Sequence, residues 1–295
     1  MKALFTTDGS QDATTAMRAG CRLLTSTDRA VDVLHVVREL RAPKSGRIAR
    51  REYQHRQAEE TKRILEEAKL VLAEEGVDAL TLCQGGSPAN VIMREAPEYD
   101  VVVIGAKGKN APPGVGLGPV ASRLIEHATG CVLVGRQPPG DRQARILVPL
   151  DGSDGSKQAL DALISLFDVG SAEIKLLHVM ETLWLPEDED AESRMRNDMD
   201  TGQTDQLALE LRQEAEQLLL DARVRILPHH PGVTTSIREG IPANEILSEA
   251  DQGDYDLIVI GATGATDMKH SVLGSVSSKV AWNAPCSVLV VRLPE

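Results

Sequence analysis

Two glycine-rich segments contain the residue types that a phosphate-binding loop requires. Residues 261–278 read GATGATDMKHSVLGSVSS, and residues 105–122 read GAKGKNAPPGVGLGPVAS. Each follows a run of Val and Ile typical of a buried strand and leads into a segment with a helical pattern. Glycine lets the backbone approach a ligand closely, and the free N–H groups at a helix start attract an anion. The pattern therefore predicts a phosphate site after each strand.

An aspartate follows another apolar run in each half of the chain. Asp8 ends KALFTTD, and Asp151 ends RILVPLD. A carboxylate at a strand end can accept hydrogen bonds from a ribose or hold a metal ion near phosphates. Ligands of open parallel sheets lie beyond the carboxyl ends of the strands, so we expect each Asp and its glycine loop to share one cavity. The alternative is that the glycines only form turns and Ser275 only caps a helix, but the same order occurs twice.

These features recur because the chain is a tandem duplication. KALFTTDGS returns as RILVPLDGS, GSPANVI as GIPANEI, YDVVVIGAKG as YDLIVIGATG, and CVLVGR as CSVLVVR. The turn-rich stretch QPPGDRQ separates the copies, so we expect two domains, residues 1–138 and 143–295. Short Val, Ile and Leu runs alternate with helical patterns in each copy. This predicts an α/β fold with a doubly wound, five-stranded sheet in each domain.

The spacing Gly261-x2-Gly264-x9-Gly274-Ser275 resembles the nucleotide-binding signature of the universal stress protein family, in its ATP-binding branch. The second-copy segments PLD, LLHV, GIPANEI and PCSVLV also look like that family. The resemblance covers nearly the whole chain as two domains in tandem. It implies two Rossmann-like domains, each with a five-stranded parallel sheet ordered 3-2-1-4-5 and flanked by helices. It also implies ATP bound at one face of the sheet.

The resemblance implies a role for each matching residue. The residue matching Val179 contacts adenine through its backbone, the one matching Asp151 meets the ribose side, and the glycine and serine residues hold phosphates. The expected ATP-binding residues of the second copy are Pro149, Asp151, Val179, Gly261, Gly264, Gly274, Ser275, Val276 and Ser277. The weaker set in the first copy is Asp8, Val36, Gly105, Gly108 and Gly118.

The first copy departs from the signature at two positions. Pro119 stands where Ser275 stands, and Thr6 stands where Pro149 stands. Proline has neither an N–H nor a hydroxyl, so two phosphate donors are lost at one position. A hydrogen bond to a charged oxygen contributes about 1.5–3 kcal/mol, so the loss lowers affinity by more than about tenfold. Two lysines of GAKGK could offset part of this. We therefore expect one tightly bound ATP per chain, with Mg²⁺, in the second copy.

Two classes of function fit this site. The first is a nucleotide-dependent regulatory protein of the stress response, whose ATP occupancy alters the surface offered to a partner protein. The alternative is a slow ATPase or a nucleotide-dependent transferase that uses the same site. No GxxxxGK[ST], GxSxG or HExxH motif occurs. The second loop offers only Lys269 and His270 as charge-stabilising groups, so we assign no catalytic residue.

Composition and charge exclude other classes. The net charge of −12 and an aromatic content of 2% argue against binding nucleic acid through phosphate neutralisation or base stacking. No apolar run reaches 18 residues, and the start MKALFTTDGS does not resemble a signal peptide. The four cysteines form no CxxC pair, which favours reduced thiols and a cytoplasmic protein. His35 and His178 are interpreted as hydrogen-bonded structural residues rather than catalytic bases.

Charge is distributed unevenly between the copies. Residues 1–140 hold 19 Lys and Arg against 17 Asp and Glu, whereas residues 141–295 hold 13 against 27. The basic segment 38–56 and the acidic segment 187–192 are either solvated loops or face each other, within one chain or between chains. The final strands, CVLVGR and CSVLVVR, are expected to pair because an apolar edge strand promotes association. The expected assembly is a homo-oligomer or a monomer with pseudo-twofold symmetry.

Overall fold

The computed structural model describes residues 1–25, 29–38, 47–109, 111, 116–181, 201–264 and 273–292, with backbone alone for residues 47–50 and 201–205. The first half contains β1 (Lys2–Thr7), α1 (Gln11–Leu23), β2 (Ala30–Val37), α2 (Arg47–Glu74), β3 (Leu80–Gly85), α3 (Pro88–Glu95), η1 (Ala96–Glu98), β4 (Val101–Gly105), α4 (Pro119–His127) and β5 (Gly130–Gly135). The second half contains β6 (Arg145–Pro149), α5 (Asp154–Leu166), η2 (Val169–Ser171), β7 (Glu173–Glu181), α7 (Thr201–Ile226), β8 (Thr234–Gly240), α8 (Pro242–Gln252), β9 (Leu257–Gly261), α9 (Ser275–Asn283) and β10 (Ser287–Arg292).

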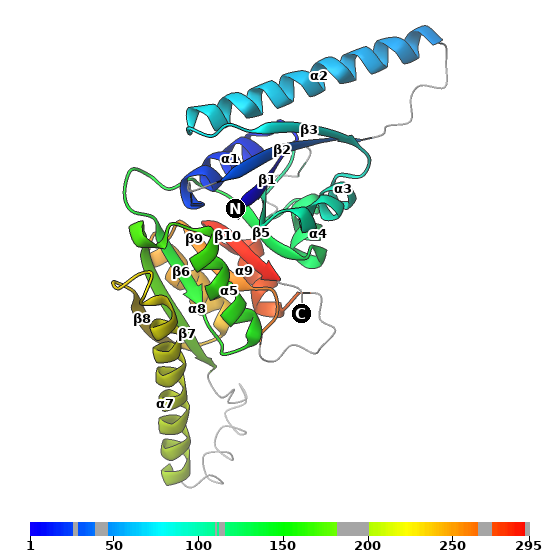
Figure 1. Ribbon diagram of the computed structural model, residues 1–295. Coiled ribbons are helices and arrows are strands. Elements are labelled where there is room, and N and C mark those ends of the chain that lie inside the picture. The colour runs from blue at the N-terminus through cyan, green and yellow to red at the C-terminus, as the bar shows by residue number, and fades with distance from the viewer. Residues whose placement is uncertain are drawn as a thin grey trace, which may run out of the picture.

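The ten strands in the described part of the chain form one sheet in the order β3-β2-β1-β4-β5-β10-β9-β6-β7-β8. Within each half the strands are parallel and follow the order 3-2-1-4-5, which confirms the predicted fold class. The halves join where β5 and β10 pair antiparallel (Figure 1). Leu133 lies opposite Leu289 in this pair. The expected pairing of the final strands is confirmed. Because the junction is antiparallel, the carboxyl ends of the strands in the two halves point in opposite directions.

Helices cover both faces of this sheet, and each face has its own core. One core joins Phe5 and Leu133 to α1, α2, α5 and α7, and the other joins Leu4 and Val132 to α3, α4, α8 and α9. Each core runs through both halves. All residues of β4 and of β9 are buried, which explains why these strands show no polar alternation in the sequence.

Two arginines connect the halves reciprocally at the junction. Arg136 follows β5 and donates hydrogen bonds to the carbonyls of Ala281, at 2.7 Å, and Cys286, at 3.0 Å. Arg292 ends β10 and donates to the carbonyls of Ile125 and Glu126, near the end of α4. Burial lowers the pKa of Arg136 from its ordinary value. Each half therefore supplies a cation to the carboxyl end of a helix in the other half, where free carbonyls favour positive charge.

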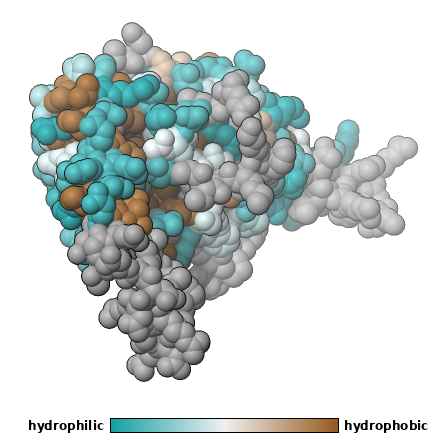
Figure 2. Space-filling model, turned by 90° about the horizontal axis from the view of Figure 1, so that it is seen from below, coloured by the Kyte–Doolittle hydropathy of each residue, from teal (hydrophilic) through white to brown (hydrophobic). Residues whose placement is uncertain are grey.

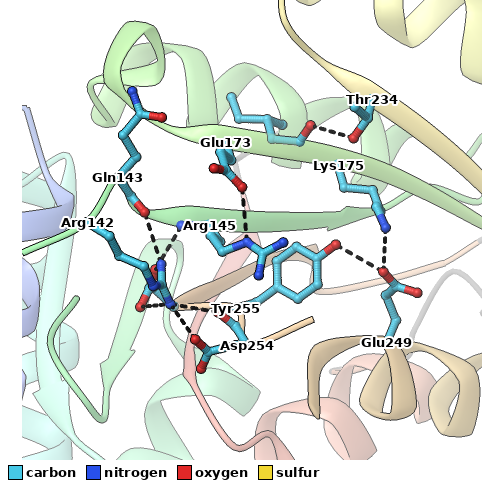
Figure 3. A network of polar contacts seen from close by, with 11 residues as sticks. Arg142, Gln143, Arg145, Glu173, Lys175, Thr234, Glu249, Asp254 and Tyr255 are labelled. Atoms are coloured by element: carbon cyan, nitrogen blue, oxygen red, sulfur yellow. Dashed lines mark hydrogen bonds and ion pairs between the residues drawn. The ribbon is translucent and has the colours of Figure 1, made fainter. Parts of the chain in front are cut away.

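A polar network lies at the amino ends of β6 and β7 (Figure 3). Glu249 of α8 accepts hydrogen bonds from Lys175, at 2.8 Å, and Tyr255, at 3.0 Å. Burial alone would raise the pKa of Glu249, but the hydrogen bonds from its neighbours outweigh it and lower the pKa. Arg145 pairs with Glu173 across these strand ends at 3.1 Å. The network joins α8 to the sheet and is remote from the carboxyl ends of the strands.

The surface seen in Figure 2 carries hydrophobic residues in separate patches among hydrophilic ones. No helix in the described part of the chain is long and apolar enough to cross a bilayer. All four cysteines are free thiols. The acidic segment 187–192 lies outside the described residues, and residues 39–46 of the basic segment do as well.

Candidate functional site

A cavity of about 480 Å³ opens at the carboxyl ends of the strands in the second half. Its walls come from the ends of β6, β7 and β9, the first turn of α9, and one side of α7. All nine residues predicted for the second copy line it: Pro149, Asp151, Val179, Gly261, Gly264, Gly274, Ser275, Val276 and Ser277. The structure therefore brings together residues that are up to 128 positions apart in the sequence. Their role in binding remains a prediction.

Asp151 is oriented by the turn between β6 and α5. Its Oδ1 accepts hydrogen bonds from the backbone N–H of Ser153, at 3.0 Å, and from the Ser153 hydroxyl, at 2.6 Å. Gly152 between them has a φ of +81°, a conformation that side-chain-bearing residues rarely adopt. The Ser153 Oγ also accepts the N–H of Ser156 at 3.1 Å, so Ser153 is the N-cap of α5. The tight turn thus fixes a carboxylate at the cavity wall.

The first glycine of the loop is required by packing. A Cβ added to Gly261 would lie 2.5 Å from the carbonyl group of Gly155, in the first turn of α5. A Cβ added to Gly155 would lie only 2.2 Å from the carbonyl oxygen of Thr263, which lines the cavity. The start of α5 therefore supports the loop from behind. Sequence reasoning missed Gly155, although a glycine in a helical first turn is a signal, because it lowers helix propensity.

The loop closes onto the start of α9. The N–H of Gly274 donates to the carbonyl of Ala262 at 2.7 Å, and Gly274 is the N-cap of the helix. Ser277 is buried, and its hydroxyl donates to the carbonyl of Gly261 at 2.6 Å. In this state Ser277 ties the helix to the loop instead of presenting its proton to the cavity. Ser275, at the first helical position, is exposed and lines the cavity.

Helix α7 supplies an apolar wall that the sequence analysis did not assign. Leu211, Ala215 and Leu218 line the cavity together with Val179. The Nδ1 of His178 lies 2.7 Å from the carbonyl oxygen of Leu150, which confirms the interpretation of this histidine as hydrogen-bonded within the fold. One side of the cavity is thus apolar, whereas the side formed by the loop and the α9 start is rich in backbone donors.

The first half has an equivalent cavity of about 410 Å³. It is lined by all five predicted residues of the first copy: Asp8, Val36, Gly105, Gly108 and Gly118. Pro119 begins α4 at the position that Ser275 occupies in α9. Thr6 donates its hydroxyl to the carbonyl of Val103 at 3.1 Å and is buried. His35 Nδ1 lies 2.8 Å from the carbonyl oxygen of Thr7, so this histidine is also engaged within the fold.

The described part of the chain holds no cluster of three or more His, Cys, Asp or Glu side chains suited to a metal ion. Among the described residues that line the cavity, Asp151 follows β6 and offers a carboxylate, a hard oxygen ligand. Mg²⁺ in nucleotide sites is commonly held by one or two carboxylates together with phosphate oxygens. The donor set thus suits an ion that arrives with a polyphosphate.

Comparisons with known proteins match both halves. A model of the universal stress protein family matches residues 1–136 and, separately, residues 144–292. A universal stress protein of Mycolicibacterium smegmatis is 25% identical over 298 residues, which cover 97% of this chain and 95% of that protein. One from Methanocaldococcus jannaschii is 33% identical over 156 residues, which cover 51% of this chain and 83% of the relative. The crystal structure of a universal stress protein from Archaeoglobus fulgidus superposes with a TM-score of 0.63 at 20% identity, over 99% of this chain and 98% of that one.

Proposed function

Because the chain belongs to the universal stress protein family, we propose that its second half binds ATP and that occupancy of this cavity regulates the surface offered to a partner protein. The observation that carries the proposal is the convergence of all nine signature residues on one cavity. We also propose the domain boundaries 1–138 and 143–295, with the turn-rich segment between them as the linker, and a cytoplasmic location.

Each part of the cavity suits one part of ATP. The apolar wall formed by Val179 and α7 suits adenine, since a flat ring gains stability from burial against aliphatic side chains. The carboxylate of Asp151 suits the ribose hydroxyls or the magnesium ion. The glycine loop and the start of α9 suit the phosphates, because free N–H groups and the helix dipole favour negative charge.

The role of Mg²⁺ follows from charge. The described charged side chains at this cavity, apart from His178, are Asp151, Glu181 and Glu214, all acidic. A triphosphate beside carboxylates is repelled unless a cation lies between them. Bound Mg²⁺ would supply that neutralisation. Asp151 and the phosphate oxygens would hold the ion.

Calorimetric titration of the purified chain with ATP and Mg²⁺ tests the proposal. We expect one tight site per chain, because Pro119 removes donors from the first cavity. Gly264→Asp is expected to nearly abolish binding, since it places a carboxylate at the phosphate position. The matched control is Gly140→Asp, which adds the same carboxylate where nothing lies within 4 Å of a Cβ. Equal affinities at two sites, or unchanged binding in Gly264→Asp, would contradict the assignment.

Regulation and turnover are separated by a second measurement. A regulatory protein should leave its bound ATP unhydrolysed through many minutes of incubation. The nucleotide released by heating should then be ATP. Phosphate release well above background, abolished by Asp151→Ala, would favour the ATPase instead.

A further inference from the structure

The two cavities occupy equivalent places in the fold but differ in charge. The described lining of the first holds three cationic side chains, Arg38, Lys107 and Lys109, and the carboxylates of Asp8 and Glu60. The acidic lining of the second cavity contains no Lys or Arg among its described residues. Lys107 and Lys109 have no lysine at the aligned positions of the second copy, which are Thr and Ala. A ligand of the first cavity therefore meets positive charge directly.

Asp8 accepts hydrogen bonds from the backbone around the cavity of its own half. Its Oδ1 accepts the N–H of Ser10 at 3.0 Å, and its Oδ2 accepts the N–H of Lys109 at 2.9 Å. A Cβ added to Gly108 would lie 2.6 Å from the same Oδ2, so the loop rests directly on the carboxylate. Both carboxylate oxygens thus hold the backbone in place. Asp8 is therefore a poor candidate for the carboxylate that a metal–triphosphate complex needs.

Lys109 is placed so that its ammonium group can meet an anion. Its Nζ lies 3.5 Å from Glu60 Oε1, and it would lie 3.2 Å from a Cβ added to Gly9, in the turn after β1. The Lys109 and Glu60 side chains are 38% and 58% exposed. An exposed ion pair at this separation is weak, so a phosphate can replace Glu60 at small cost. The ammonium then remains at the cavity wall.

The start of α4 lacks two phosphate donors that the start of α9 has. Pro119 occupies its first position and has no N–H, whereas Ser275 at the same place in α9 has both an N–H and a hydroxyl. Three cations against two carboxylates leave the described lining of the first cavity with an excess of one positive charge. This excess offsets at least about half of the charge of a phosphate monoester, about −1.5 to −2, but only a small part of the charge of a free triphosphate. Its apolar lining, which includes Leu34, Ile64 and Ile92, matches a ring system as in the second half.

We propose that the first cavity binds a nucleotide with a single phosphate group, without a divalent metal, and that Lys107 and Lys109 hold that phosphate. This inference rests on the proposed function, since it takes the cavity to be a nucleotide site. It assigns different ligands to the two halves of one chain.

The test is calorimetric titration of the full chain with AMP in the presence of EDTA. We expect one site per chain, an affinity that falls with added salt, and an affinity at least about tenfold lower in Lys107→Thr/Lys109→Ala, which installs the second-copy residues. The matched control is Lys62→Thr/Lys69→Ala. It removes the same two charges from α2 in the same half, outside this cavity, and should bind AMP like the wild type. The charge-preserving Lys107→Arg/Lys109→Arg should retain binding, and unfolding midpoints check that each variant folds.

Several outcomes would overturn the inference. AMP binding that survives Lys107→Thr/Lys109→Ala but is lost in Gly264→Asp would place AMP in the second cavity. AMP binding that requires Mg²⁺ would show that the lysines are insufficient. Absence of AMP binding in a protein that binds ATP with Mg²⁺ would overturn this inference alone, whereas absence of both would overturn the proposed function as well.

Discussion

Gly155→Ala tests whether the start of α5 sets the position of the phosphate loop. Gly155 does not line the cavity, but a Cβ at this position would lie 2.2 Å from the carbonyl oxygen of Thr263. Ordinary contact between such atoms begins near 3.4 Å, so the loop or the helix must move by roughly 1 Å. The first half has Asp12 at the aligned position, so the close approach at Gly155 is a feature of the second half.

The magnitude follows from two opposing terms. Overpacking of this kind costs about 1–3 kcal/mol, whereas alanine is favoured over glycine in a helix by about 1 kcal/mol. The clash at 2.2 Å is with backbone, so the overpacking cost should lie in the upper part of its range, about 2–3 kcal/mol. We therefore expect the free energy of unfolding to fall by roughly 1–2 kcal/mol as the net result. Displacement of Thr263 should also cost the ligand about one charge-assisted hydrogen bond, and hence about tenfold in ATP affinity.

Urea unfolding and calorimetric titration with ATP and Mg²⁺ measure the two effects. Gly140→Ala is the matched control, because nothing lies within 4 Å of a Cβ at Gly140. It should leave both quantities within experimental error. The reasoning is refuted if Gly155→Ala binds ATP as tightly as the wild type and unfolds within about 0.5 kcal/mol of it, the range of a neutral surface substitution.

Four further predictions follow from other parts of the molecule. Arg136→Met should lower the free energy of unfolding by about 2–4 kcal/mol, because two charge-assisted hydrogen bonds across the junction are lost; urea unfolding measures it. The pKa of Glu249 is lowered in the folded state, so its carboxylate contributes stability above the ordinary pKa of 4.5 and loses this contribution as the pH falls through the folded value. In Glu249→Gln, the free energy of unfolding should therefore depend less on pH in that range, as acid unfolding measures. Pro119→Ser should raise the affinity of the first cavity for ATP with Mg²⁺, seen as a second calorimetric site. If the basic and acidic insertions join separate chains, the mass from light scattering should fall between low salt and about 1 M salt, and an unchanged mass would favour solvated loops.

The sequence alone predicted the parts of the site that depend on local spacing. The glycine pattern and the aspartate after each first strand placed Asp151 and Gly261 at neighbouring strand ends, and both line the cavity. Parallel sheets allow this because consecutive strand ends meet at one edge. The repeat likewise predicted the pairing of the final strands.

Other features depend on contacts between segments far apart in the chain, which the spacing of residues along the sequence does not predict. The approach of Gly155 to Thr263 arises where the start of α5 packs against the end of β9, and the two lie far apart in the sequence. The hydroxyl of Ser277 was expected to face phosphate, yet in the structure it bonds to a loop carbonyl, because the first turn of α9 lies over the end of β9. The arginine at the end of each final strand is visible in the sequence, but the carbonyls that Arg136 reaches belong to the other half.

The covalent connection across the β5–β10 junction has a consequence for how the two halves can evolve. Two separate chains would have to associate in solution and would dissociate on dilution. A short linker instead gives the partner strand a high effective concentration at any dilution. In a homodimer every substitution appears at both symmetry-related sites. Here Pro119 alters one cavity and leaves the other intact. Fusion of the halves thus allows the two sites to differ in sequence and in function, which is impossible in a symmetric pair of identical chains.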